Sequence, residues 1–442
     1  MKFTFVSNYI NHHQLPMAKK MYEILKEDYA FIETQPMTEE RQQLGWGEDG
    51  QIPFVYKYYE QEALCKQKIL ESDIVMFGGV DEDDYILERL QLRKPVIRYA
   101  ERFYKEGRIK AISPRGLRRK YKEHTKYRKA PVYLLCAGAY VALDYDIVCA
   151  YPKKKFTWGY FPENRKYGFR ELFSSKCITE ETLENFKKNL TKDFLFTEEK
   201  KLETEKGTNS NTKESMESVN QENEKSKTIK LLWAGRMIPW KHPSDVLRLA
   251  KDLKKQRDLP KFEITMIGSG ILEEDLKKQA KEQGVEDCIT FTGSMKPAMV
   301  REYMEKSDIY LFTSDYMEGW GAVMNEAMNS GMCVVANAGI GAAHSLIHSG
   351  ENGLLYPNGE YESFLSHVKG LMLEEETRLS MGAKAYRTIQ EKWNPDYAAE
   401  QLLALSKAIC QEYEEKGTNG VYKEPKYFNR PKDGPMSRPS LY

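Results

Sequence analysis

Two glutamates in the latter half of the chain, Glu318 and Glu326, are separated by seven residues. Glu318 lies in a polar, glycine-bearing loop that spans 314–321, directly after a short apolar run. Glu326 lies in a run of helix formers that Gly331 ends. If this helix begins near Gly321, both carboxylates face the carboxyl ends of the strands, where open α/β sheets bind their ligands. The spacing also fits an ordinary turn with two solvated glutamates, so the pair alone does not distinguish a ligand site from such a turn.

Donors for an anion occur at two places in the same half. Backbone N–H groups at Gly319, Trp320 and Gly321 are expected to point toward the mouth of the sheet and suit a phosphate. Arg236 and Lys241 follow an earlier strand. Arginine binds as a planar fork and lysine as a point charge, so the two suit a diphosphate. Two solvated cations after a strand are the alternative.

A glycine-bearing turn, IGSG, closes the strand at 262–267. Gly268 and Gly270 would let the backbone approach a nucleotide closely, or they would simply make a tight turn. A lone G-x-G does not distinguish these two interpretations.

The three segments resemble, in order, motifs of retaining glycosyltransferases of the GT-B type, family 4. AGRMIPWK resembles the family's G-R-x4-K element, IGSG its I-G-x-G element, and EGWGAVMNEAM its E-x7-E segment. The resemblance runs almost continuously from Ile229 to about Trp393. It implies transfer of a hexose from a nucleotide-diphosphate sugar of UDP or GDP type, with retained anomeric configuration, no cofactor and no required metal ion.

The resemblance also implies a role for each motif residue. Glu318 would contact the donor sugar, while Arg236 and Lys241 would stabilise the leaving diphosphate, which could itself take the acceptor proton. Glu326 would contact the nucleotide ribose. The other residues expected to line the donor and nucleotide site are Gly268, Gly270, Gly319, Trp320 and Gly321.

The first half departs from the family pattern. Members of the family carry a glycine pair in the loop after the first strand, where this chain has His12 and His13. These histidines would serve the donor phosphates, or they belong to a polar loop. Near the end of the fourth predicted strand, where the family has a histidine, stand Glu101 and Arg102. We expect these two on the acceptor or donor-sugar side.

Strands that alternate with helices in both halves predict an α/β protein with parallel sheets. With the resemblance, this gives the GT-B architecture, in which two Rossmann-like domains face each other across a cleft. Residues 196–228 are almost free of apolar side chains, which predicts a mobile linker. The predicted parts are an acceptor-side domain at 1–195, this linker, a nucleotide-sugar domain at 229–395, a crossover helix at 396–412 that braces the first domain, and a polar tail at 413–442, either disordered or laid over the surface.

Composition narrows the function classes. The chain has 442 residues and a net charge of +1, whereas a nucleic-acid-binding protein is expected to have a basic surplus. Seven scattered cysteines without a C-x-x-C pair fit reduced cytosolic thiols better than disulfides or a zinc site. The start of the chain predicts a strand and not a signal peptide, and no apolar run is long enough to span a bilayer. A cytoplasmic protein is expected.

Three further features need an interpretation. Two D-x-D triplets, Asp81–Asp83 and Asp144–Asp146, match a metal motif of the other glycosyltransferase fold, and we interpret both as structural. The stretch 107–129 is rich in Lys and Arg and could meet an anionic membrane at the inner face, although a solvated helix face would have the same composition. The acceptor expected from the family is a glycan or a lipid-linked glycan in cell-surface polysaccharide assembly.

Two other functions stay open from the sequence. A nucleotide-sugar epimerase or hydrolase of the same fold would carry the same donor motifs. A non-catalytic module that binds a sugar nucleotide or a glycan would fit the unusual first half.

Overall fold

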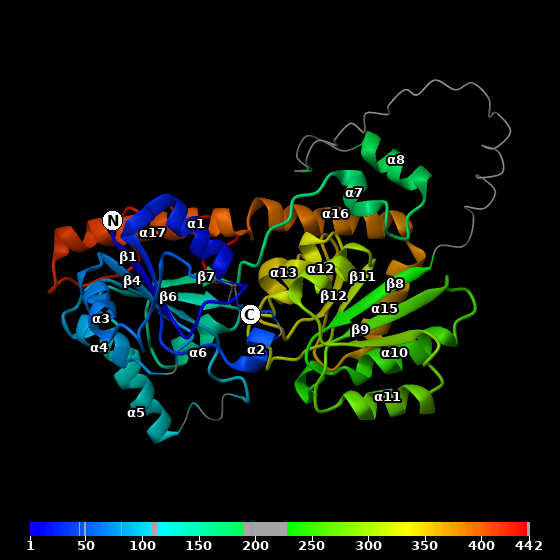
Figure 1. The fold of residues 1–442 in the computed structure, drawn as a ribbon, viewed down its shortest axis with the longest axis horizontal. Helices are drawn as coiled ribbons and strands as arrows, with labels where there is room; N and C mark the ends of the chain where they lie inside the picture. Colours follow the sequence, from blue (N-terminus) through cyan, green and yellow to red (C-terminus); the bar gives the residue numbers. More distant parts are fainter. Residues whose placement is uncertain are drawn as a thin grey trace.

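The computed structural model contains two domains, each built on one parallel β-sheet (Figure 1). It describes residues 1–43, 45–47, 50–80, 82–107, 111, 113–189, 196 and 228–439. The predicted linker at 196–228 therefore lies outside the described residues except for its two ends. The predicted α/β class with two parallel-sheet domains is confirmed.

The sheet of the first domain has seven parallel strands in the order β3-β2-β1-β4-β5-β6-β7. The strands are β1 (Phe3–Ser7), β2 (Tyr29–Glu33), β3 (Val55–Lys57), β4 (Ile74–Gly78), β5 (Val96–Ala100), β6 (Val132–Ala137) and β7 (Lys155–Trp158). The central strands are buried on both faces, which explains why they are continuous apolar runs in the sequence. The helices are α1 (Leu15–Leu25), α2 (Glu39–Gln43), α3 (Glu62–Glu71), α4 (Leu87–Gln91), α5 (Pro114–Glu123) and α6 (Val141–Ile147).

The sheet of the second domain has six parallel strands in the order β10-β9-β8-β11-β12-β13. The strands are β8 (Ile229–Ala234), β9 (Phe262–Ile267), β10 (Ile289–Gly293), β11 (Ile309–Phe312), β12 (Cys333–Asn337) and β13 (Leu354–Tyr356). The helices are α10 (Ser244–Lys254), α11 (Glu273–Glu282), α12 (Pro297–Glu305), α13 (Val323–Asn329), α14 (Ala343–Leu346), α15 (Tyr361–Leu373) and α16 (Glu375–Glu391). The strand order reverses between β8 and β11, and the loops after these two strands carry the predicted diphosphate and sugar motifs.

Two short helices, α7 (Phe169–Phe173) and α8 (Glu180–Lys188), lie on the second domain, although the sequence predicted them within the first (Figure 1). Their apolar side chains pack against α16, and the backbone N–H of Tyr167 donates to the hydroxyl of Tyr386 at 2.9 Å. The buried Lys176 ammonium donates to the carbonyl of Ser307 at 2.7 Å. The packing therefore corrects the boundary of the first domain from 195 to a point before Tyr167.

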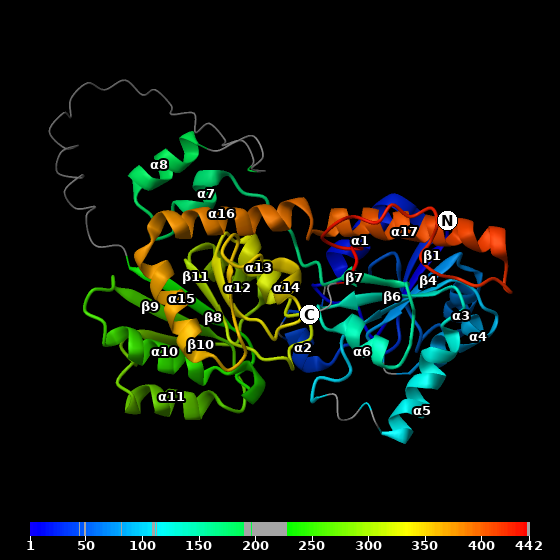
Figure 2. The same ribbon diagram turned by 180° about the vertical axis from the view of Figure 1, so that it is seen from behind.

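The last helix, α17 (Pro395–Lys416), returns to the first domain and packs along α1. Asn394 caps α17, because its side chain accepts the N–H of Tyr397 at 2.9 Å. Lys20 of α1 forms an ion pair with Asp396 at 3.0 Å. Figures 1 and 2 show α16 and α17 running one after the other across both domains.

The segment after α17 is laid over the first domain, the second of the two alternatives for the tail. The N–H of Met436 donates to the carbonyl of Thr157 at 2.7 Å, and the N–H of Thr157 donates to the carbonyl of Ser437 at 2.9 Å. Met436 is fully buried. The segment thus covers the open edge of β7, which would otherwise expose unpaired backbone groups.

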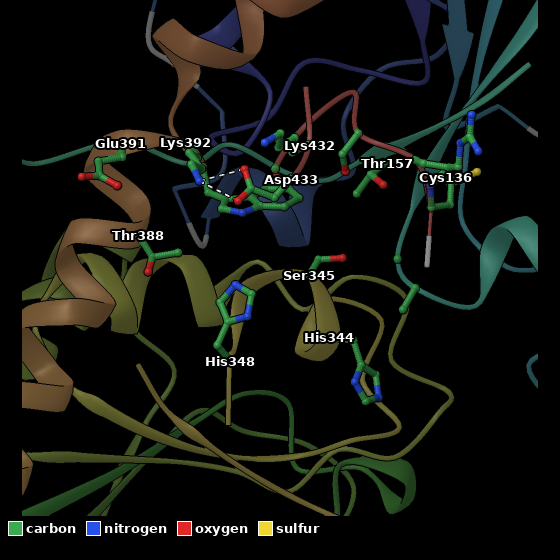
Figure 3. A pocket seen from close by; sticks show the side chains of 17 residues that line it. Cys136, Thr157, His344, Ser345, His348, Thr388, Glu391, Lys392, Lys432 and Asp433 are labelled. Atoms are coloured by element: carbon green, nitrogen blue, oxygen red, sulfur yellow. Dashed lines mark hydrogen bonds and ion pairs between the residues drawn. The ribbon is translucent and has the colours of Figure 1, made fainter. Parts of the chain in front are cut away.

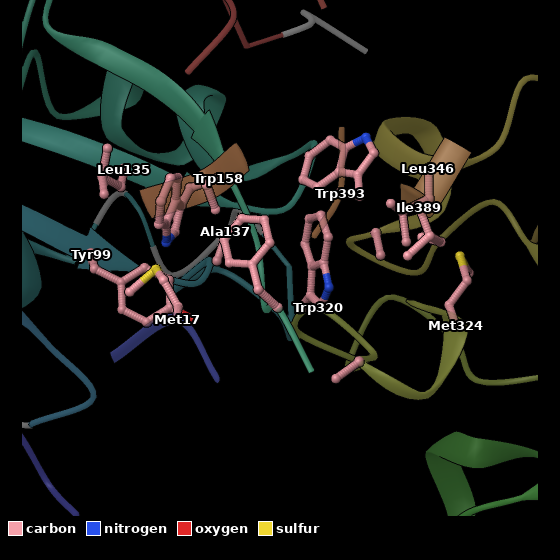
Figure 4. Close-up of a cluster of buried hydrophobic side chains, with 14 of the residues drawn as sticks. Met17, Tyr99, Leu135, Ala137, Trp158, Trp320, Met324, Leu346, Ile389 and Trp393 are labelled. Carbon is pink, nitrogen blue, oxygen red and sulfur yellow. The ribbon is translucent and has the colours of Figure 1, made fainter. Parts of the chain in front are cut away.

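An apolar cluster joins the two domains beneath the cleft (Figure 4). The indole of Trp320 from the second domain lies against Gly159 of the first, where an added Cβ would be 2.3 Å from the ring. On its other side, Trp320 packs against Trp393, with ring centroids 5.3 Å apart. Trp158 and Tyr99 extend the cluster into the first domain. The two sheets therefore share a continuous core at their junction.

Two helical glycines of the second domain give a matched test of this packing. An added Cβ at Gly382 of α16 would lie 2.4 Å from the carbonyl oxygen of Gly331, just after α13, whereas Gly370 of α15 has open space around it. We expect Gly382→Ala to lower the free energy of unfolding by about 1–3 kcal/mol through overpacking. Gly370→Ala is expected to raise it by up to about 1 kcal/mol through helix propensity. Thermal unfolding of the two variants measures both, and equal effects would contradict this account.

Candidate functional site

The loops after β8 and β11 are tied together by a chain of hydrogen bonds. The indole N–H of Trp233 donates to the hydroxyl of Thr313 at 3.0 Å, and this hydroxyl donates to the carbonyl of Lys241 at 2.6 Å. The backbone N–H of Asp315 donates to the carbonyl of Trp240 at 2.9 Å. The two predicted motifs, separated by more than 70 residues in the sequence, are therefore held side by side at the carboxyl edge of the sheet.

Lys241 and Glu318 form an ion pair within these loops. The Lys241 ammonium lies 2.5 Å from Oε2 of Glu318, and the two side chains are only 12% and 18% exposed. Burial by itself would favour the neutral carboxyl, but the Lys241 ammonium and the Ser314 hydroxyl outweigh it, so the pKa of Glu318 is lowered. Glu318 is thus ionised and Lys241 is fixed beside it.

Arg236 lies on the same loop as Lys241 and is exposed. In the described part of the chain its guanidinium forms no ion pair or hydrogen bond. Arg41 lies on α2 in the first domain. Burial and electrostatic repulsion by Arg236 together lower the pKa of its guanidinium. Cations from both domains therefore lie near the mouth of the second sheet, an arrangement that an anion would stabilise.

The loop at 319–321 supplies backbone donors. Among the described residues, the N–H groups of Gly319, Trp320 and Gly321 meet no acceptor of the protein. Gly321 has φ +86°, a left-handed conformation that favours glycine. The indole of Trp320 is buried at the domain junction and donates to Oδ1 of Asn325 at 2.9 Å. The contact of its backbone N–H with a donor stays a prediction.

The two glycines of the IGSG turn are explained by the packing of the loops. An added Cβ at Gly268 would lie 1.9 Å from the carbonyl oxygen of Gly235, and one at Gly270 would lie 2.5 Å from that of Met237. Both glycines thus allow the loop after β9 to lie directly against the loop that carries Arg236. Their contact with a nucleotide stays a prediction.

On the first domain, Glu101 meets the motif loop of the second. An added Cβ at Gly319 would be 1.9 Å from a carboxylate oxygen of Glu101, so glycine is required for this approach. The carboxylate accepts hydrogen bonds from Lys105 at 2.8 Å and from the hydroxyl of Tyr160 at 3.0 Å. Glu101 is therefore placed beside the Glu318 loop, and its contact with an acceptor or a donor sugar stays a prediction.

Arg102, predicted beside Glu101, has its contacts elsewhere. Its guanidinium lies 3.4 Å from the buried carboxylate of Asp144 and stacks over the ring of Tyr140 at 5.2 Å. Arg102 therefore contributes to the packing of the first domain. The structure does not bring it to Glu318. Asp144 is thereby structural, and so is Asp83 of the other D-x-D triplet, which binds Arg98 through two hydrogen bonds of 2.7 and 2.8 Å. Asp81 lies outside the described residues.

His12 and His13 lie opposite Glu326. One nitrogen from each histidine and one carboxylate oxygen of Glu326 lie within 4.8 Å of one another. Burial lowers the pKa of His12 to about 4, and burial together with His12 lowers the pKa of His13 well below its ordinary value. Burial raises the pKa of Glu326 to about 7. At neutral pH, two uncharged imidazoles therefore face a carboxyl group that readily accepts or releases a proton.

Several residues of this cleft were missed by the sequence analysis. Tyr160 and Lys105 surround Glu101, and Arg41 stacks over the rings of Tyr9 and Trp46 at 5.4 and 5.1 Å. None of these residues belongs to a spaced motif.

A separate cavity of about 260 Å³ lies at the domain junction near the end of α16 (Figure 3). His344, His348 and Lys432 line it, and the Lys392 ammonium pairs with Asp433 at its wall at 2.7 Å. None of the predicted site residues lines this cavity. The predicted site residues therefore lie outside this cavity.

The two motif glutamates should show opposite effects on stability. The folded-state pKa of Glu326 is above its ordinary value of 4.5, so its ionisation costs stability above about pH 7 and nothing below pH 4.5. We expect Glu326→Gln to stabilise the protein at pH 8 by about 1–3 kcal/mol and to have little effect at pH 4. The pKa of Glu318 is lowered, so its ionisation has the opposite effect and stabilises the folded protein at high pH. Glu318→Gln is expected to destabilise at pH 8, by a difference that shrinks as the pH falls.

Thermal unfolding of both variants in chelator-containing buffer, from pH 4 to pH 8, measures these differences. The same sign for the two variants at pH 8 would contradict the electrostatic description of the site.

Comparison with known proteins agrees with the motif geometry. Residues 214–388 match the family model described as glycosyl transferases group 1. The chain is 27% identical over 187 residues to the amylovoran biosynthesis glycosyltransferase AmsK of Erwinia amylovora. This match covers 41% of the chain and 45% of the relative, so the chain spans less than half the length of that protein.

Solved structures resemble the whole chain. HepE of Anabaena in complex with UDP and glucose superimposes with a TM-score of 0.53 at 13% identity, over 94% of this chain and 98% of that one. A glycosyltransferase from Rickettsia africae gives a TM-score of 0.59 at 14% identity, over 92% and 98% of the two chains. Identities this low show the fold alone. The chain therefore has the GT-B fold, and its residues 214–388 match the glycosyl transferases group 1 family.

Proposed function

We propose that the protein is a retaining glycosyltransferase that moves a sugar from a nucleotide-diphosphate sugar to an acceptor. The observation that carries the proposal is the convergence of Arg236, Lys241 and Glu318 on loops joined by hydrogen bonds at the switch point of the second sheet. The family of the second domain and the GT-B fold of the chain support it.

The charges of the site suit a diphosphate leaving group. Arg236 and Lys241 supply two positive charges, and the amides at 319–321 supply donors that no other group of the described chain uses. A bound diphosphate would compete with Glu318 for the Lys241 ammonium, which lies 2.5 Å from the carboxylate. Glu318 would then be released to contact the sugar. Because these groups neutralise the growing charge themselves, we propose transfer without a required metal ion.

The transfer step follows from this placement. The bond between the anomeric carbon and the diphosphate oxygen breaks, and a bond from the acceptor hydroxyl forms on the same face of the sugar. The acceptor proton passes to the departing diphosphate, whose negative charge Arg236 and Lys241 stabilise. Glu318 orients the sugar and stabilises positive charge at the anomeric carbon. Glu101 and Tyr160 lie across the cleft, on the side from which an acceptor of the first domain would approach.

The donor and acceptor are proposed by class. HepE binds UDP and glucose, which supports a UDP-type donor here. The Erwinia relative is named for amylovoran biosynthesis, which supports a glycan or lipid-linked glycan acceptor in surface polysaccharide assembly.

Nucleotide binding tests the cationic pair. We expect UDP or GDP to raise the melting temperature of the protein by mass action. Arg236→Ala and Lys241→Ala should each weaken the binding of that nucleotide by about tenfold to a hundredfold, because each removes a charge-assisted hydrogen bond. Glu318→Gln should preserve most of the binding and lower sugar transfer by about a hundredfold.

Lys255→Ala is the control, because Lys255 is an exposed lysine of the same domain that pairs with Asp252. Full transferase activity in all three site variants would reject the assignment. Free isomerised sugar in the absence of an acceptor would favour an epimerase, and nucleotide binding without turnover across a panel of glycan acceptors would favour a binding module.

We also propose a peripheral membrane contact at the inner face through α5. This helix lies at the outer edge of the first domain (Figures 1 and 2). Leu117 and Tyr121, one turn apart, are 40% and 58% exposed, and Arg115, Arg118 and Lys122 are exposed beside them. Apolar side chains among cations suit the surface of an anionic bilayer. Among the described helices, none is long and apolar enough to cross a membrane.

Vesicle co-sedimentation tests this contact. At low salt, the full chain should bind vesicles that contain phosphatidylglycerol and should be released as the salt concentration rises, because screening weakens the attraction. The triple variant Arg115→Glu, Arg118→Glu, Lys122→Glu should lose binding. The control replaces Lys277 and Lys278 of α11 with glutamate. Equal binding of neutral and anionic vesicles, or none to either, would reject the contact.

A further inference from the structure

His12, His13 and Glu326 bring potential metal ligands together from the two domains. The histidines follow β1 in the first domain, and Glu326 lies on α13 of the second. One ligand atom from each side chain lies within 4.8 Å of the other two. The two imidazole rings lie next to each other, with centroids 3.8 Å apart and planes tilted by 53°. More than 300 residues separate the histidines from the glutamate, so sequence spacing does not reveal the cluster.

The surroundings fix the histidines without using their ring nitrogens. The backbone N–H of His12 donates to the carbonyl of Trp46 at 3.1 Å, and the indole of Trp46 meets the His12 ring edge-on at 5.1 Å. Nδ1 of His12 is buried, and no group of the described chain hydrogen-bonds to it. A buried nitrogen without a partner needs an explanation, because such groups are rare in folded proteins.

The carboxylate of Glu326 is equally unused. Within the described residues it forms no hydrogen bond and no ion pair, although it is half-buried on a helix that packs tightly against α16. Its neighbour Asn325, by contrast, accepts the indole N–H of Trp320. Three side chains that could each bind a ligand are thus directed at one another across the domain boundary without satisfying one another.

The ligand set selects the kind of ion. Two nitrogens and one carboxylate oxygen form the three-ligand set of open Zn²⁺ sites, whereas Mg²⁺ and Ca²⁺ prefer oxygen alone. With metal–ligand bonds of about 2.0–2.2 Å, the ligand atoms must close to roughly 3.4 Å. The present separations of up to 4.8 Å would thus have to shorten by at most about 1.4 Å.

We propose that His12, His13 and Glu326 bind one Zn²⁺-class ion that bridges the two domains when no donor is bound. Water would take the fourth position. The proposal rests on the proposed function in one respect: the resemblance assigns Glu326 to the nucleotide ribose, so ion and donor exclude each other at this carboxylate. The ion is therefore an inhibitory ligand and not a requirement for transfer.

Metal titration of the full chain tests the site directly. The protein, freed of metal with a chelator, is titrated with Zn²⁺ by calorimetry and with Co²⁺ by visible absorption. Exposed thiols would bind either ion, so the experiments use the Cys149→Ser background. The expected result is one ion per chain at micromolar or lower concentration, with the visible bands of tetrahedral Co²⁺ and without a thiolate charge-transfer band.

The variants separate the two sides of the bridge. His12→Ala, His13→Ala and Glu326→Gln should each weaken binding at least tenfold, and His348→Ala, which removes an exposed histidine outside the cluster, should leave it unchanged. Thermal unfolding shows that each variant is folded. Because the cluster spans two domains, the ion should also raise the melting temperature of the parent protein more than that of any cluster variant.

Unchanged Zn²⁺ affinity in all three cluster variants, absence of binding at micromolar Zn²⁺, or a thiolate band in the Co²⁺ spectrum would overturn the proposal. The titration uses neither donor nor acceptor. It can therefore fail while transferase activity is demonstrated, and it can succeed while the transferase proposal is rejected.

Discussion

The ion pair between Lys241 and Glu318 is the interaction on which the rest of the cleft depends. A largely buried charge is tolerated only when it is paired and hydrogen-bonded, and here each partner satisfies the other. The pairing also requires the loops after β8 and β11 to lie together, which Trp233 and Thr313 achieve through side-chain hydrogen bonds. Arg236, on the same loop as Lys241, is left with its charge unpaired within the described chain. The second domain thus holds an ordered set of charges before any ligand arrives.

The close approach of the two domains requires glycine at the positions where their backbones meet. An added Cβ at Gly341 would lie 1.7 Å from the carbonyl oxygen of Gly319, and Gly138 of the first domain touches both residues. Trp320 fills the space beneath them against Gly159. Because the backbones meet this closely, Glu101 reaches the motif loop and the histidine pair reaches α13. Any side chain at these glycines would separate the groups on which the cleft chemistry depends.

The sequence predicted best what is encoded locally. Strands buried on both faces are apolar runs, and the motif loops follow them directly, so both sheets and the placement of Lys241 near Glu318 could be anticipated. Contacts between distant segments could not. Trp320 looked like part of a donor loop, but its indole is buried by residues far from it in the sequence. Arg102 was predicted on the acceptor or donor-sugar side, but its guanidinium contacts Asp144, which is distant in the sequence. The apolar residues of α7 carried no sign of which domain they cover.

The path of the chain interlocks the two halves. The segment with α7 and α8 leaves the first domain and packs on the second, whereas α17 and the segment after it leave the second and pack on the first. Cleavage anywhere between residues 196 and 228 would therefore yield two fragments, each holding helices that complete the other's core. Such fragments would stay associated after a protease cut, and neither would fold as an autonomous unit. The reciprocal exchange makes this protein suited to split-fragment reassembly at that point, and unsuited to dissection into separate domains by simple truncation.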